Sequence, residues 1–325
     1  MRSMGSINGG LTKSLAQKVK DLVLENDVDY VGIAPVDRFK NAPRGHRPQD
    51  LLPGAQSVIS VGTRVSKGPQ LGQQMALRDR RFRHVAFSYR WLGYGLINMY
   101  FNDRAAFLVT RLLEEEGYLS VPIVGSGVEE MRQMMGAFSN RHAAVAAGLG
   151  EIGWNGLCLT PESGPRQRFS SVITTAPLEP DPMYSGPRLC DPERCKAPGS
   201  GRPVCVKACP LNLFSSRETT EAVIGERQFT YAAMDHVKCG GTIGLGIHPL
   251  VLGADSPKIP RTVDMDVIAD LAAKAPPWLK LVTVAFGRGH WCGLCLLRCP
   301  VGMAQDVEKI LAEWSPHREE EGRMR

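Results

Sequence analysis

The sequence predicts an α+β fold in two parts that divide near residue 180. Over the first part, short apolar runs typical of strands alternate with segments of helical periodicity, which favours a sheet layered against helices. After "EPDPMYSGP" the composition shifts toward proline, glycine and cysteine, as at a domain boundary. We therefore expect a disordered leader at 1–10, a first domain at 11–180 and a second domain at 181–325.

Local patterns define the expected elements of the first domain. Helical periodicity is present at 11–26, at 98–116 and through much of 129–150. Buried strands are expected in "DYVGIAPV" (29–36), "QSVISVGTRV" (56–65) and "YLSVPIV" (118–124). "LCLTPESGPRQRFSSVITTAPL" (157–178) predicts a hairpin that turns at Ser163-Gly164-Pro165. The second domain is expected to be loop-rich, with helices within 265–286 and 304–314, the first of them in an inserted helical segment at about 240–290.

Composition and charge exclude few classes of partner. The chain has 325 residues, 43% of them hydrophobic and 22% charged, which is ordinary for a globular protein with a real core. The formal charge of +6 permits an anionic partner without requiring one. No apolar run approaches the roughly 20 residues of a membrane span. The start "MRSMGSINGGLTKS" has no export signal pattern, so we expect a cytoplasmic protein that does not enter a membrane.

The nine cysteines carry the strongest signal in the sequence. In a reducing cytosol, cysteine clusters bind metal or perform chemistry more often than they form disulfides. Eight of them form two sets that each close in Cys-x3-Cys-Pro: Cys190, Cys195, Cys205 and Cys209 in the first, and Cys239, Cys292, Cys295 and Cys299 in the second.

This ending is that of the bacterial ferredoxin motif, C-x2-C-x2-C-x3-C-P, whose fourth cysteine binds the other cluster. Two 4Fe–4S clusters are therefore expected, with zinc as the alternative, since thiolates suit both. The crossover rule assigns Cys190, Cys195, Cys205 and Cys299 to one cluster, and Cys209, Cys239, Cys292 and Cys295 to the other. The Gly/Pro-rich stretch 196–204 would loop out between two ligands. Cys158 lies in a strand pattern and is expected in the core.

The segment "AVAAGLGEIGWNG" formally matches the dinucleotide-binding pattern at Gly148, Gly150 and Gly153. Its context argues against that function, because a helical run precedes it, a strand follows, and no acidic residue stands about 20 positions on. Another role for these glycines is needed.

"RHAAVAAGLGEIGWNGLCLTPESGPRQRFSSVITTAPL" (141–178), followed by a double ferredoxin motif, resembles the cobalamin-dependent iron–sulfur reductases. This family comprises the epoxyqueuosine reductases and the reductive dehalogenases, and "DYVGIAPV" and "LLPGAQSVISVG" extend the likeness upstream. The resemblance implies a nitroreductase-like α/β domain that binds base-off cobalamin, followed by a ferredoxin-like domain with two 4Fe–4S clusters. One cluster would deliver electrons to the corrin, and the other would accept them from an external donor such as a ferredoxin or a flavodoxin-like protein.

A corrin is broad and flat and carries amide arms, so its site needs close backbone and scattered hydrogen-bond donors. On the resemblance, the cofactor-binding residues are expected to be Asn140, Gly148, Gly150, Gly153, Trp154, Asn155, Thr160 and Arg168.

The chain departs from both groups at the position of the proton donor. Epoxyqueuosine reductases resemble one another in a Val-Asp-Ser stretch, where this chain has Val124-Gly125-Ser126, and their C-terminal helical repeats have no counterpart here. The dehalogenases' tyrosine has none either, because no Tyr stands between Leu119 and Met183. A divergent branch is therefore expected.

His142, Arg141 and Tyr94 are the candidate catalytic residues. A histidine has the ordinary pKa best placed for proton transfer near neutrality, although His142 could instead cap or orient a helix. Arg141 would hold an anionic group, or be a solvated helix residue. Tyr94, with Tyr89 and Tyr100, is an alternative donor, although aromatics at this spacing are typical of a core.

We expect an oxidoreductase that performs a reductive elimination, dehalogenation or deoxygenation of a small organic substrate. The first alternative is an epoxyqueuosine reductase acting on tRNA, for which Arg78, Arg80, Arg81 and Arg83 offer phosphate contacts, although a solvated loop, a corrin-tail contact or a docking site for the donor protein explains them better. The second is an electron-transfer or corrinoid-reactivating protein without a small substrate of its own.

Overall fold

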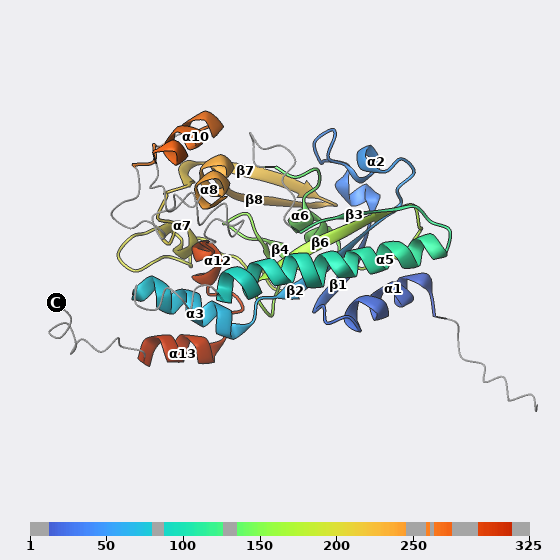
Figure 1. The fold of residues 1–325 in the computed structure, drawn as a ribbon, viewed down its shortest axis with the longest axis horizontal. Coiled ribbons are helices and arrows are strands. Elements are labelled where there is room, and N and C mark those ends of the chain that lie inside the picture. The colour runs from blue at the N-terminus through green and yellow to red at the C-terminus, as the bar shows by residue number, and fades with distance from the viewer. Residues whose placement is uncertain are drawn as a thin grey trace, which may run out of the picture.

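The computed structural model describes residues 13–79, 88–125, 135–244, 258–260, 263–274 and 292–313. Its centre is an antiparallel sheet of four strands in the order β1-β2-β6-β3 (Figure 1). The strands are β1 (Tyr30–Pro35), β2 (Ser57–Arg64), β6 (Gln167–Thr174) and β3 (Ser120–Ile123). The three strands predicted at 29–36, 56–65 and 118–124 are confirmed. β2 and β6 are buried almost throughout, as the two middle strands of a covered sheet must be.

Helices cover both faces of this sheet. On one face, α1 (Leu15–Leu24) and α5 (Asp103–Glu115) enclose a core that includes Val19, Ile59 and Val109. On the other face, the alanine-rich α6 (Asn140–Ala146) packs against Val58 and Ile173. Small side chains let α6 approach the strands closely, which brings residues 140–142 next to the sheet.

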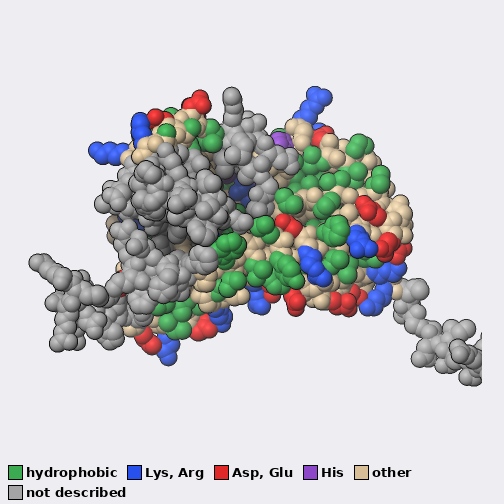
Figure 2. Space-filling model, in the orientation of Figure 1, with side chains coloured by type: hydrophobic (Ala, Val, Ile, Leu, Met, Phe, Trp, Pro, Cys, Tyr) green, Lys and Arg blue, Asp and Glu red, His purple; other side chains and the backbone are tan. Residues whose placement is uncertain are grey.

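The helix predicted at 98–116 begins earlier than expected. A π-helix, η3 (Trp91–Asn102), runs directly into α5, and Figure 1 shows them as one long rod. Apolar residues occur on several faces of η3, so the sequence lacks the single apolar face by which a helix is recognised. Leu92, Leu96 and Met99 are exposed, and Figure 2 shows apolar side chains gathered over this part of the rod.

The hairpin predicted at 157–178 is wrong. β5 (Cys158–Leu159) pairs with β4 (Glu151–Ile152), whereas β6 leaves the turn and joins the main sheet between β2 and β3. The turn itself forms, with Thr160 bridged to Gly164. Local pattern identified the strands and the turn, but the pairing partner is set by contacts distant in sequence. The helix predicted through much of 129–150 is confirmed only over α6: residues 135–139 and 147–150 are described and not helical, and 126–134 lie outside the described residues.

The second part contains a hairpin that the sequence reading missed. β7 (Phe214–Ile224) and β8 (Arg227–Met234) pair across Gly225-Glu226, with Gly225 at φ 59°. The signal was present: "TTEAVIGERQFTYAAM" is β-branched and aromatic around a glycine turn. The helices described in the second part are α7 (Val204–Lys207), α8 (His236–Gly244), α10 (Met265–Ala273), α12 (Leu294–Leu297) and α13 (Gln305–Glu313). Both predicted helices are confirmed over α10 and α13, while 275–291 lie outside the described residues.

Three short helices complete the fold: η1 (Val36–Phe39), α2 (Pro48–Leu51) and α3 (Lys67–Arg78). α3 lies against α13, where Lys67 Nζ is 2.8 Å from Asp306 Oδ2 and Arg78 donates to the carbonyl of Leu311. The division at residue 180 stays a prediction. Within the described ranges, no helix is long and apolar enough to cross a membrane.

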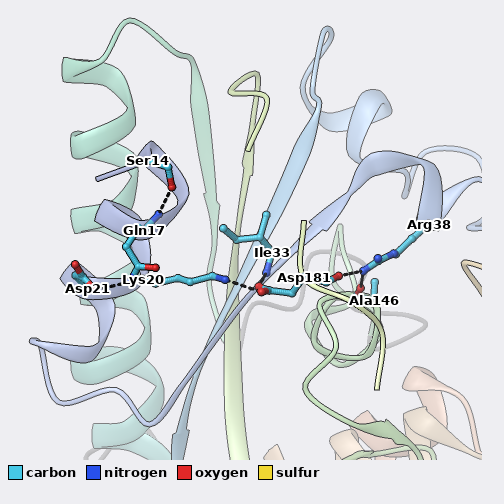
Figure 3. Close-up of polar contacts among 8 residues, drawn as sticks. All are labelled: Ser14, Gln17, Lys20, Asp21, Ile33, Arg38, Ala146 and Asp181. Atoms are coloured by element: carbon cyan, nitrogen blue, oxygen red, sulfur yellow. Dashed lines mark hydrogen bonds and ion pairs between the residues drawn. The ribbon is translucent and has the colours of Figure 1, made fainter. Parts of the chain in front are cut away.

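Asp181 fastens the chain to the sheet directly after the first part (Figure 3). One carboxylate oxygen accepts the backbone N–H of Ile33 in β1 at 2.9 Å, and the other pairs with Lys20 Nζ of α1 at 2.5 Å. Arg38 donates to the carbonyls of Asp181 and Ala146 at 2.8 and 2.5 Å. The start of the second part is thereby fixed to β1, α1 and α6 at once.

Replacing Asp181 with alanine should lower the free energy of unfolding by about 1–3 kcal/mol, because a partly buried N–H loses its acceptor together with an ion pair. Asp181→Asn should lose less, since its amide oxygen can still accept from Ile33. Chemical denaturation measures both changes. The exposed pair Lys67–Asp306 supplies the control: Asp306→Ala should change stability much less, and an equal loss in the two alanine variants would contradict the assignment.

Candidate metal centres and cofactor-binding residues

Four cysteines line a single cavity of about 270 Å³. They are Cys190, Cys195, Cys205 and Cys299, which we call the first cysteine group, and they come from three separate stretches of chain. These are the four that the crossover rule assigns to one cluster. Trp154, Asn155, Pro300 and Val301 also line the cavity.

A buried carboxylate holds the loop that carries Cys190. Glu151, only 4% exposed, accepts the backbone N–H groups of Leu189 and Cys190 at 2.6 and 3.1 Å. Its other oxygen is paired with Arg227 of β8 at 3.3 Å. The backbone N–H of Trp154 donates to Cys190 Sγ at 3.2 Å. Hydrogen bonds to sulfur of this kind tune the potential of iron–sulfur sites. The sequence reading did not single out Glu151.

The stretch 196–204 loops out between Cys195 and Cys205, as expected. Lys196 and Pro203 form an isolated bridge, and the backbone N–H of Val204 returns to the carbonyl of Cys195 at 3.1 Å. Gly199 and Gly201 take positive φ values of 68° and 62° within the loop, a region in which other residues are strained. The excursion therefore leaves the two cysteines beside each other.

The remaining four cysteines, the second cysteine group, also lie close to one another. They are Cys209, Cys239, Cys292 and Cys295. Burial raises the pKa of Cys239 to about 12 and that of Cys295 to about 11, and the pKa of Cys292 rises well above its ordinary value. In each case the charge on other members of the group raises it further. Mutual repulsion of this kind requires the thiols to be neighbours.

The two groups adjoin. Asn155, which lines the cavity of the first group, donates through Nδ2 to the carbonyl of Cys295 at 3.4 Å. Burial raises the pKa of Cys205, and the nearby charges that raise it further begin with Cys295 of the second group. Among the described residues, no three His, Cys, Asp or Glu side chains are grouped so as to hold a single metal ion. Cys158 is 3% exposed in β5, and burial raises its pKa, so its expected place in the core is confirmed.

At the three glycines of "GLGEIG", other atoms of the chain occupy the space that a side chain would need. A Cβ on Gly150 would lie 1.8 Å from the carbonyl oxygen of Leu159, and one on Gly148 would lie 2.1 Å from that of Pro182. Gly153 meets the side chain of Leu159 at 2.8 Å. The glycines thus allow β4, β5 and the 182 region to pack closely. Their expected contact with a corrin stays a prediction.

Gly150→Ala should destabilise the protein by about 1–3 kcal/mol or more, since the methyl group would overlap backbone rather than a movable side chain. Thermal unfolding without added cofactor measures this. Gly68→Ala is the matched control, because nothing lies within 4 Å of its added Cβ in α3, and helix propensity predicts slight stabilisation. If Gly150→Ala is as stable as the parent protein, the packing explanation fails.

The segment 139–142 places the candidate catalytic residues at the start of α6. Asn140 donates to the carbonyl of Val124 at 2.9 Å and accepts from Ser171 Oγ of β6 at 2.7 Å. Arg141 Nη1 donates to the carbonyl of Gly156 at 3.0 Å. His142 Nδ1 is 2.5 Å from the hydroxyl of Ser139, the residue before the helix. That contact favours the helix-orienting role for His142.

Burial, together with the positive charge of Arg141, lowers the pKa of His142 from 6.5 to about 4. The imidazole is therefore neutral at neutral pH. The role of His142 as a proton donor stays a prediction. Burial also lowers the pKa of His236 in α8, again with a contribution from Arg141.

The free energy of unfolding should fall as the pH drops from 6.5 to about 4. In this range His142 is protonated in the unfolded chain and remains neutral in the folded one, so acid favours the unfolded state. One such proton contributes a slope of up to about 1.4 kcal/mol per pH unit. His142→Gln should flatten the dependence over this window, with some slope left from His236. Urea denaturation at several pH values measures it, and an unchanged slope in the variant would rule out the lowered pKa.

The other predicted cofactor-binding side chains are distributed over three places. Thr160 is fully buried, accepts from the backbone N–H of Ser163 at 3.2 Å and donates to the Tyr30 hydroxyl at 3.4 Å, so its bonds join the turn after β5 to β1. Trp154 and Asn155 line the first cysteine cavity. Arg168 places its guanidinium carbon 4.5 Å from the ring centre of Tyr94, and burial raises the pKa of Tyr94. Arg80, Arg81 and Arg83 lie outside the described residues.

Comparison with known proteins shows relatives of two kinds. No family model matches the chain. The chain is 35% identical over 106 residues to the tetrachloroethene reductive dehalogenase of Dehalobacter restrictus, covering 30% of this chain and 18% of that protein. With the enzyme of the same name from Sulfurospirillum multivorans the identity is 42% over 79 residues, covering 24% and 14%. The epoxyqueuosine reductase of Staphylococcus aureus is 22% identical over 227 residues, covering 62% and 53%.

The chain is related to both groups. The sequence analysis expected a resemblance to both kinds of enzyme, the reductive dehalogenases and the epoxyqueuosine reductases, and the matches confirm it. The aligned stretch spans less than a fifth of the dehalogenases' length and about half that of the reductase.

Solved structures of both kinds of enzyme are also similar. An epoxyqueuosine reductase from Bacillus subtilis matches 90% of this chain and 67% of its own, with 15% identity and a TM-score of 0.45. A reductive dehalogenase matches 90% and 39%, with 14% identity and a TM-score of 0.47.

Proposed function

We propose that this protein is an oxidoreductase with two 4Fe–4S clusters and base-off cobalamin, and that it performs a reductive elimination, dehalogenation or deoxygenation of a small organic substrate. The observation that carries the proposal is the meeting of eight cysteines in two adjoining groups of four. The relation to two groups of reductases gives the reaction class.

The residues present fit two iron–sulfur clusters. Each group supplies four sulfur donors, and the first surrounds a cavity. Cys299 and Cys209 each precede a proline and would bind the cluster made mostly by the other set. Backbone N–H groups next to sulfur, such as that of Trp154, favour the thiolate form that a cluster requires. Because the groups adjoin, an electron accepted at one is close to the other.

A buried amide near the sheet fits the carboxamide arms of a corrin. Both amide atoms of Asn98 in η3 are buried without a hydrogen-bond partner, and its Oδ1 would lie 2.8 Å from a Cβ on Gly125. An amide arm offers the donor and the acceptor that these two atoms lack. Asp103 fixes the backbone next to this amide, since its Oδ1 accepts the backbone N–H of Gly125 at 2.8 Å and the hydroxyl of Ser170 at 2.6 Å. Bound cobalamin would supply the reducing power at the substrate.

The chain's own residues would then position the substrate and supply its proton. Arg141 keeps its charge beside His236 and Tyr231, and in this proposal binds an anionic substituent of the substrate. Tyr94 holds its hydroxyl proton at neutral pH, because burial raises its pKa, and is the stronger candidate for the donor. His142, kept neutral, would orient α6.

A second candidate is reduction of epoxyqueuosine in tRNA. An alignment of 227 residues with an epoxyqueuosine reductase, covering 62% of this chain, favours it. Glycine stands at position 125, where that family has its acid, which weighs against it. Gly125 weighs equally toward the third candidate, an electron-transfer or corrinoid-reactivating protein. Turnover of halogenated organic compounds, of epoxyqueuosine-bearing tRNA, or of neither separates the three.

Anaerobically purified protein should contain about eight irons per chain, as two cubanes require. Cys190→Ser and Cys209→Ser should each lose about half of the iron, and the Cys209 variant should lose the cluster of the second group, built mainly by Cys239, Cys292 and Cys295. Iron analysis and electron paramagnetic resonance (EPR) measure these changes. Cys158→Ala is the control and should keep all of the iron.

Zinc without iron in the parent protein would refute the clusters. If the Cys209 variant instead loses the cluster of Cys190, the crossover is wrong. Adding cobalamin to the anaerobic protein should give a base-off spectrum, and an unchanged cobalamin spectrum would remove the corrinoid part of the proposal while leaving the clusters.

A further inference from the structure

Two arginines, Arg166 and Arg168, flank the first residue of β6. Arg166 stands directly before β6 and Arg168 is its second residue, and the carbonyl of Arg166 accepts the backbone N–H of Val65 beyond the last β2–β6 pair. Each is directed to a different cysteine group. Neither pattern nor resemblance assigned a role to Arg166, and Arg168 was expected to contact the corrin.

Arg166 is bound to the stretch that carries Cys299. It is 2% exposed, and its guanidinium donates to the carbonyls of Cys299, of Val301 at 2.7 Å and of Ser163 at 3.2 Å. Burial lowers the pKa of Arg166, and Cys299 is the strongest nearby charge that opposes this. The cation therefore lies beside the first cysteine group.

Arg168 reaches the second group through Tyr89. Its Nη2 donates to the Tyr89 hydroxyl at 3.2 Å. That hydroxyl lies against the backbone of Gly293, where an added Cβ would be 2.2 Å away, between Cys292 and Cys295. The second cation is thus set against the "CGLC" turn.

Among the described residues, neither guanidinium is in direct contact with a carboxylate, although the charge of Glu308 lies near Arg166. The Nε of each is also buried, with no hydrogen-bond partner in the described part of the chain. A buried charge is costly unless an opposite charge compensates it. Four thiolates around an iron–sulfur cluster give a net anion, which would be that compensation.

We propose that Arg166 and Arg168 each set the reduction potential of one cluster, Arg166 that of the first cysteine group and Arg168 that of the second. The inference rests on the proposed function. One-electron reduction adds one negative charge to a cluster, and a fixed cation beside it stabilises that charge, so each arginine should raise its own cluster's potential. Both are positioning residues, since neither is a ligand.

The test is an EPR-monitored redox titration of the anaerobic protein and its variants. Cys190→Ser and Cys292→Ser first assign the two reduction waves, because each removes a ligand of one group. Arg168→Gln should then lower the potential of the second wave by about 59 mV, a tenfold change in the ratio of oxidised to reduced cluster, and leave the first wave in place. Arg166→Gln should lower the potential of the first wave and leave the second in place. Arg168→Lys keeps the charge, so the potential of its second wave should return most of the way to that of the parent protein.

Arg64→Gln is the matched control. Arg64 ends the neighbouring strand opposite Gln167, but its side chain is 60% exposed and pairs with Asp29. It loses the same charge and should move neither wave. Arg166→Lys keeps the charge while losing the carbonyl contacts, so a potential near that of the parent protein separates charge from packing.

Equal shifts of both waves in Arg168→Gln, or no shift in any variant, would overturn the inference while the iron content leaves the proposed function standing. A parent protein without iron would overturn both.

Discussion

The hydrogen bonds of the Arg166 guanidinium are the interaction on which the rest of the structure depends. They fasten the chain at Cys299 and Val301 to the turn at Ser163, and that turn leads directly into β6. β6 is paired on both sides, by β2 and β3. The last cysteines are therefore held on a central strand of the sheet. A site supported by a doubly paired strand is positioned more rigidly than one carried on loops alone.

The sequence reading was strongest where local pattern decides the structure. Short apolar runs bounded by turn residues located β1, β2 and β3, because a strand covered by helices is apolar along its length. Cysteine spacing and the two Cys-Pro endings pointed to the same sets of four that the fold brings together. Residues that bind one metal centre have to reach it together, and this restricts how far apart they can lie in the sequence.

It was weaker where distant contacts decide. β5 and β6 look like the two arms of a hairpin, but Gly150 allows β4 to approach Leu159 so closely that β5 takes β4 as its partner. Gly148, Gly150 and Gly153 resembled a ligand-binding loop for the same reason: a close approach by the chain itself and one by a cofactor both exclude a side chain. The lowered pKa of His142 needed the burial and the neighbouring Arg141, which no local pattern shows. The sequence held one usable signal for Arg166: a second arginine, Arg168, follows two residues later in the predicted strand.

The position of Cys299 in the cavity of Cys190, Cys195 and Cys205 constrains the order in which the protein matures. Three of these four sulfurs leave the ribosome long before the fourth. During that interval the emerging chain holds an incomplete set of thiols, exposed to oxidation or to the wrong metal. The second group faces the same delay, because Cys209 must wait for Cys292 and Cys295. In the proposed function, both cysteine groups would be completed by one late event, the docking of the segment 292–301 onto Arg166, so metal loading and completion of the fold would become a single step.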